Sequence, residues 1–71
     1  MDIMSDTIDK LNSYSGREQV WFLWWWHSTI KDEGDLLRYQ RITDSTQGKL
    51  DPFDWSIIAD KLNEYEEEQH V

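Results

Sequence analysis

The run QVWFLWWWHS, residues 19–28, constrains the fold more than any other part of the chain. It holds four of the five tryptophans of a 71-residue chain, together with Phe22. A chain this short buries only about 60% of the surface that its unfolded form exposes, so its core is small. Each tryptophan can bury roughly 200 Å² of surface. We therefore expect this run to supply much of the core of a single domain spanning residues 1–71.

The residues before this run predict a helix. Ser15 and Glu18 have the S-x-x-E spacing of a capping box, in which each side chain binds the backbone of the other residue. The helix is expected to start at Gly16, to end at about residue 30 or 31, and to be closed by Gly34 as a left-handed cap. A β-hairpin is the alternative, because aromatic and β-branched residues also suit strands. The capping box and the length of the segment favour the helix.

The last segment of the chain carries the clearest helix signals. Asp51 fits the N-cap position and Pro52 the first helical position. A core-facing stripe follows at helical spacing, formed by Trp55, Ile58, Leu62 and Tyr65. A first short helix is expected from Ser5 or Asp6 to about Tyr14. Residues 35–43 fit either a helix or a strand.

These elements predict an all-α fold, a compact bundle of three or four short helices. The alternative is an α+β fold in which helices accompany a two-stranded hairpin over residues 20–43. In the helical case, one face of the tryptophan helix is expected to be buried, the face formed by Val20, Leu23, Trp24 and His27. The other aromatic residues are then candidates for an exposed docking surface, namely Trp21, Phe22, Trp25 and Trp26. Complete burial of the helix as a central core element is the competing interpretation.

The charge balance restricts the class of partner. Fifteen acidic residues against seven basic ones give a net charge of −8 and a pI near 4.4. Nucleic acid and anionic membranes should repel such a chain, whereas basic protein surfaces should attract it. The apolar run Val20–Trp26 is far shorter than the ~20 residues that cross a bilayer. The acidic start of the chain has no secretory signal and the sequence has no cysteine, which favours the cytosol.

The C-terminal helix should present an acidic face. Asp60, Glu64, Glu67 and Glu68 fall within roughly 100° of one another, opposite Trp55. A merely solvated face is one interpretation. A binding role is the other, because several of these acids lie near the helix C-terminus, where the dipole disfavours negative charge. The residues predicted to bind a partner are Asp60, Glu64, Glu67, Glu68, Phe53, Ile57, Trp21, Trp25 and Trp26.

Catalytic, cofactor and metal sites find little support in the sequence. The histidines are His27 and His70. His27 and Ser28 are neighbours, so on a helix their side chains point about 100° apart and cannot form a nucleophile–base pair. The three glycines are too widely spaced for a phosphate-binding loop, and the acids around Asp32 lack calcium-loop spacing. We therefore expect no enzyme activity, no cofactor and no metal.

Small size, strong acidity and dense aromatic residues together favour a binding module. In this profile the chain resembles small phage-encoded anti-defence proteins, including anti-CRISPR proteins and other nucleic-acid mimics. The resemblance covers the whole chain through size and charge, and no functional position carries over from it. It implies an inhibitor in the host cytosol that occludes a basic, nucleic-acid-binding surface of a larger protein, without binding nucleic acid or membrane itself. The alternatives are an accessory subunit or homodimer that associates through the tryptophan helix, and a transcription regulator that acts through a protein partner.

Overall fold

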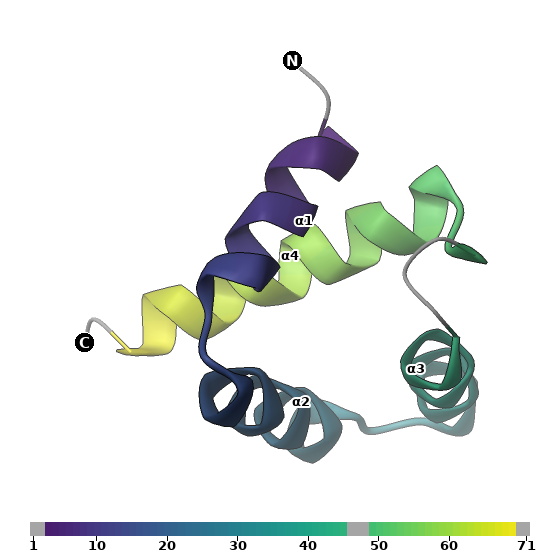
Figure 1. The fold of residues 1–71 in the computed structure, drawn as a ribbon. Helices are drawn as coiled ribbons and strands as arrows, with labels where there is room; N and C mark the ends of the chain where they lie inside the picture. Colours follow the sequence, from purple (N-terminus) through teal and green to yellow (C-terminus); the bar gives the residue numbers. More distant parts are fainter. Residues whose placement is uncertain (1–2, 46–48, 70–71) are drawn as a thin grey trace.

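The computed structural model describes residues 3–45 and 49–69, and it folds these residues into four helices (Figure 1). They are α1 (Ile3–Ser13), α2 (Gly16–Thr29), α3 (Glu33–Asp44) and α4 (Pro52–Gln69). Within these two ranges there is no strand. The prediction of an all-α bundle is confirmed, and the hairpin alternative over residues 20–43 is wrong.

The longest helix, α4, is the element on which the others assemble. Helix α1 crosses α4, and α2 packs against α4 as well (Figure 1). Helix α3 lies beside the N-terminal half of α4 in Figure 1, where it is seen nearly end-on. The side of α4 turned away from its neighbours is consequently free to face solvent.

Local capping fixes where three of the helices begin. Ser15 Oγ accepts from Glu18 N at 3.1 Å, and the Glu18 carboxylate accepts from Ser15 N, which confirms the predicted capping box of α2. Asp51 Oδ1 likewise accepts from Asp54 N at 2.9 Å at the start of α4, as predicted. Asp32 caps α3 by accepting from the backbone N–H three residues later, at 2.8 Å.

Two predicted helix boundaries are wrong. Gly34 is not a left-handed cap of α2, because no described glycine has a positive φ and Gly34 lies in the first turn of α3. The Asp32 cap starts a new helix at this point and removes the need for such a cap. Helix α1 begins at Ile3, before the predicted Ser5 or Asp6.

The core is built from aromatic and aliphatic side chains of α2, α3 and α4. Its buried members are Phe22, Trp26, Ile42, Trp55, Ile58 and Leu62. The predicted stripe on α4 is confirmed, with Tyr65 partly buried at its end. Phe22 contacts three aromatic rings at centroid distances of 5.5 to 6.2 Å, those of Trp25, Trp26 and Tyr65.

The predicted buried face of α2 is wrong. Trp24 is 68% exposed, Val20 and His27 are exposed, and Leu23 is only partly buried. Phe22 and Trp26 occupy the core instead, with exposures of 1% and 4%. This rotation gives the core the aromatic cluster centred on Phe22, and apolar area removed from water is what stabilises a small domain. Helix α2 is apolar on nearly every side, so its hydrophobic pattern alone did not select the buried face.

An ion pair between the exposed Arg41 and the buried Asp54 joins α3 to α4. The carboxylate of Asp54 is buried and accepts two hydrogen bonds from the Arg41 guanidinium, at 2.9 and 2.6 Å. This bidentate contact lowers the pKa of Asp54 despite the opposing effect of burial. Tyr39 links α3 to α2 by donating from its hydroxyl to the Leu23 carbonyl at 3.2 Å. Burial raises the pKa of the Tyr39 hydroxyl.

Among the helices of the described ranges, none combines the length and the hydropathy that crossing a bilayer requires.

Candidate partner-binding surface

The outer face of α4 carries the acidic residues predicted from the sequence. Asp60, Glu64, Glu67 and Glu68 are all exposed. Glu64 accepts a weak contact from Lys61 at 3.4 Å, on the protein surface. Within residues 3–45 and 49–69, Asp60 and Glu67 have no ion-pair partner. The predicted acidic face therefore exists, with most of its charge uncompensated.

Acidic residues on the inner side of α4 form ion pairs with other helices. Asp54 is paired with Arg41, and Glu66 forms an ion pair with Lys10 of α1. Glu66 also lies close to Tyr14, whose pKa is raised by burial and by this neighbouring carboxylate. The chain thus pairs the acids that face other helices with cations, whereas of the four outer acids only Glu64 has an ion-pair partner, Lys61, within the described residues.

A surface groove joins the acidic face to the tryptophan helix. It is lined by the Trp25 indole, by Thr29 and by the carboxylates of Glu64, Glu67 and Glu68. Trp25 Nε1 donates a hydrogen bond to a Glu68 carboxylate oxygen, which holds α2 and α4 together along this groove. The Trp25 ring also packs against Tyr65 at 5.4 Å between centroids. One aromatic wall therefore stands beside three carboxylates.

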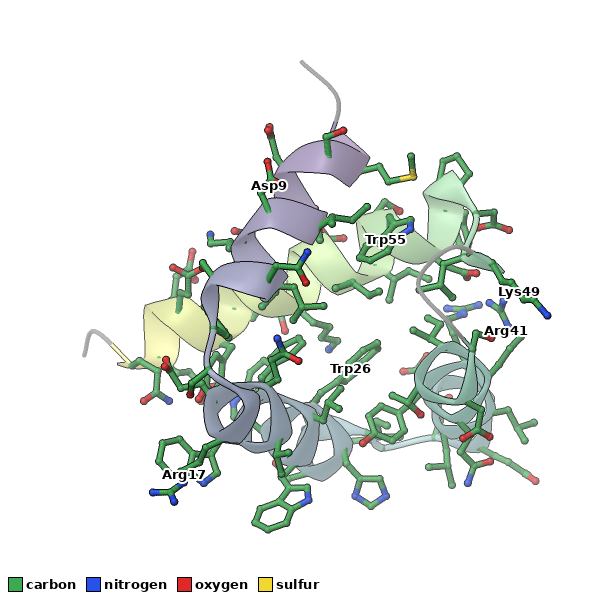
Figure 2. All side chains as sticks on the ribbon, in the orientation of Figure 1. Asp9, Arg17, Trp26, Arg41, Lys49 and Trp55 are labelled. Atoms are coloured by element: carbon green, nitrogen blue, oxygen red, sulfur yellow. The ribbon has the colours of Figure 1, made fainter. Side chains whose placement is uncertain are left out.

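Two further tryptophans extend this surface along α2. Trp21 precedes Trp25 by one helical turn, so the two lie on the same side of the helix, and Trp21 is 50% exposed. Trp24 lies further round the outer face with Val20. Arg17, labelled in Figure 2, lies on this outer side at the start of α2. The exposed apolar face of α2, made of Val20, Trp21 and Trp24, thus adjoins the groove through Trp25.

Phe53 and Ile57, the two apolar residues of α4 predicted to bind a partner, lie beside cationic side chains. Phe53 is exposed, but the Arg38 guanidinium lies over its ring, 5.7 Å from the centroid. Ile57 is partly buried and lines a small groove with Arg38 and Lys61. Asp35 lines the same groove, so charges of both signs border this apolar spot. The reason is that α3 brings Arg38 to α4, a contact that helix periodicity within α4 cannot reveal.

The structure also revises the list of candidate aromatic contacts. Trp26 is in the core, where it meets the edge of Tyr39 at 5.1 Å, so it is not available to a partner. Trp24 takes its place as the most exposed tryptophan of the run. Sequence reasoning missed Trp24 because it assigned the wrong rotation to α2. The spacing of Phe22 and Trp26 could not have shown this, because Val20 with Trp24 and Trp21 with Trp25 have the same i, i+4 spacing.

The chemistry of this surface suits a cationic side chain. Carboxylates accept the hydrogen bonds of guanidinium and ammonium groups, and a tryptophan face attracts the same cations. Within the part of the chain that the structure describes, no group of three or more acidic or histidine side chains is arranged to hold a metal ion. His70, one of the two histidines, lies outside the described residues. Comparisons with protein-family models, with curated proteins and with solved structures found no match to this chain.

Proposed function

We propose that the protein binds a basic surface of a larger, nucleic-acid-binding protein and blocks that surface. The observation that carries the proposal is the exposed acidic face of α4, adjoining the groove walled by Trp25. The inhibitor would act by occupancy alone, without enzyme activity, cofactor or metal. It would belong to the same functional class as phage anti-CRISPR proteins and other nucleic-acid mimics, and would act in the host cytosol.

The spacing of the acids supports mimicry of a nucleic-acid backbone. Asp60, Glu64 and Glu68 recur every four residues, a rise of about 6 Å for each step along the helix. Glu67 adds a second row beside them. Phosphates along one DNA strand advance by about 3.4 Å, so the two rows of carboxylates match this spacing only loosely, and their negative charge is what would occupy a groove lined by arginine and lysine. An arginine groove recognises carboxylate and phosphate through the same bidentate geometry.

The tryptophans add a contact that phosphates do not provide. An arginine that pairs with Glu67 or Glu68 also comes within reach of the Trp25 ring, because all three line one groove. Cation–π contacts contribute about 0.5–1 kcal/mol at exposed sites. Clustered aromatic residues at the edge of a charged surface are typical of binding hot spots. The aromatic wall should therefore hold a target that the acids first attract.

Charge reversal on α4 tests the proposal. The parent chain is first used to capture its target protein from a host lysate. The triple variant Asp60→Lys/Glu64→Lys/Glu67→Lys should then lose binding to that protein. It should also lose binding to an oligo-arginine peptide, with both affinities measured by calorimetry. Binding of the parent should weaken steeply as salt rises, and nucleic acid should compete with it. Retained binding with unchanged salt dependence would refute mimicry by this face.

A matched control variant distinguishes the effect of the α4 face on binding from the effect of net charge. Asp9, Glu33 and Asp44 are exposed acids on α1 and α3, away from the α4 face. Replacing all three with lysine changes the net charge of the chain by the same amount. If the proposal is right, this control variant keeps most of the affinity of the parent. Equal losses in the two variants would show that charge acts without a defined surface.

Self-association through α2 is a second candidate function. The observation that favours it is the exposed apolar face of α2. In this face Trp24 is 68% exposed and Trp21 is 50% exposed. Exposed aromatic patches of this kind mark interfaces. Sedimentation equilibrium should then show a dimer that persists at high salt and that Trp24→Ser dissociates. A monomer at all concentrations would exclude this candidate.

A further inference from the structure

An apolar cavity of about 180 Å³ lies between the four helices, lined by residues from each of them. Its walls are core side chains, among them Phe22, Trp26, Ile42, Trp55 and Ile58. Figure 2 shows Trp26 reaching from α2 toward the middle of the molecule. The acids of the α4 outer face take no part in it. The cavity is therefore a separate feature from the proposed partner-binding surface.

The size of this cavity is unusual for so small a core. Protein interiors are close-packed, and voids larger than a water molecule are few. An engineered apolar cavity of about 150 Å³ in another protein stays dry and binds benzene. The cavity here is of the same order and has aromatic walls, so it has room for one six-membered ring. Thr43, which is exposed, is among the residues that line it.

The polar rim of the cavity points to the chemistry of its ligand. Gln19, Thr43 and Ser45 line the cavity along with the apolar side chains. Each already donates to a backbone carbonyl: Gln19 Nε2 to Leu11 at 2.9 Å, Thr43 Oγ1 to Tyr39 at 2.9 Å, and Ser45 Oγ to Arg41 at 2.8 Å. Their oxygens remain as acceptors. The rim therefore contains hydroxyl and amide oxygens that can accept a hydrogen bond from a ligand.

We infer that this cavity binds a small neutral aromatic molecule that carries one hydrogen-bond donor, with phenol as the simplest example. The ring packs between the aromatic side chains, and its hydroxyl donates to an acceptor oxygen of the rim. An anionic ligand is disfavoured, because the apolar walls contain no cation and the chain carries a net charge of −8.

Titration of the full-length chain with phenol, anisole and benzoate tests the inference. Phenol should shift the amide resonances of cavity residues and raise the Tm. Anisole has the same ring and oxygen but no donated hydrogen, so it should bind about fivefold more weakly, the factor that one net hydrogen bond of about 1 kcal/mol gives. Benzoate should leave the cavity resonances unchanged. Absence of any phenol-induced shift would overturn the inference. Equal binding of phenol and anisole would overturn the part of it that requires a hydrogen-bond donor on the ligand.

A pair of leucine variants locates the binding. Leu23 lines the cavity, whereas Leu37 is exposed on α3. Leu23→Phe should fill the cavity and abolish phenol binding, while Leu37→Phe should leave it unchanged. If circular dichroism shows that Leu23→Phe does not fold, Leu50→Phe fills the same cavity from the segment before α4. Phenol binding that survives in a folded cavity-filling variant would overturn the inference.

Discussion

The rotation of α2 can be tested with one substitution made at two nearby aromatic positions. Phe22→Ala removes a fully buried ring, and such changes cost about 3–5 kcal/mol. Domains are stabilised by roughly 0.05–0.15 kcal/mol per residue, which for 71 residues is about 4–11 kcal/mol in total. Phe22→Ala should therefore remove a large part of the stability. Trp24→Ala changes a side chain that is 68% exposed, so it should alter stability by less than about 0.5 kcal/mol.

Thermal and urea unfolding, followed by circular dichroism, measure both effects. In a domain of this size, 1 kcal/mol shifts the Tm by about 4–8 °C. Phe22→Ala should lower the Tm by at least about 12 °C, and Trp24→Ala by less than about 4 °C. The urea m-value should stay constant, which would show that stability changed and not the unfolded state. Equal losses in the two variants would refute this packing, and a larger loss in Trp24→Ala than in Phe22→Ala would favour the face formed by Val20, Leu23 and Trp24.

Three further predictions concern single contacts. Because Arg41 lowers the pKa of Asp54 in the folded chain, the stability from this pair is present above the ordinary pKa of 3.8 and is lost as the pH falls. Asp54→Asn should accordingly be less stable than the parent at pH 7 in urea unfolding, and the difference should shrink toward pH 2. Ser15→Ala should cost about 0.5–2 kcal/mol in the same assay, with a Ser13→Ala control near zero. Trp25→Phe keeps an aromatic ring but replaces the stronger cation–π partner, so it should weaken oligo-arginine binding measured by calorimetry while the fold is kept; unchanged affinity would remove Trp25 from the site.

Local signals in the sequence predicted most of the helices. The Ser15 capping box, the Asp51 cap and the apolar stripe on α4 each depend on residues within a few turns of one another. Short-range rules of this kind hold without knowledge of the rest of the fold. Because α4 has a polar and an apolar side, its acidic face was also predictable from the periodicity of the sequence.

Contacts between distant segments were not predictable in the same way. Helix α2 is apolar almost all round, so its rotation depends on the partner that it meets, and Tyr65 of α4 supplies that partner by packing on Phe22 and Trp25. The pair of Arg41 and Asp54 joins residues 13 positions apart on different helices. From the sequence alone, Asp54 is an acidic residue in the first turn of a helix, and nothing near it in the chain indicates that Arg41 is its partner.

The two candidate functions are compatible in one molecule when the dimer forms through Val20 and Trp24, because Trp21 lies on the same side of α2 as Trp25. Trp24 lies about 100° round the helix from Trp25, so a dimer formed through Val20 and Trp24 leaves the groove beside Glu67 and Glu68 open. Such a dimer would present two acidic faces to a target, and binding at two sites raises avidity without any new contact. The two interfaces would respond differently to salt, because carboxylate–cation contacts are screened and apolar contacts are not. Salt should therefore release the target while the dimer stays intact, and a dimer that dissociates together with the target would contradict this division of roles between the two helices.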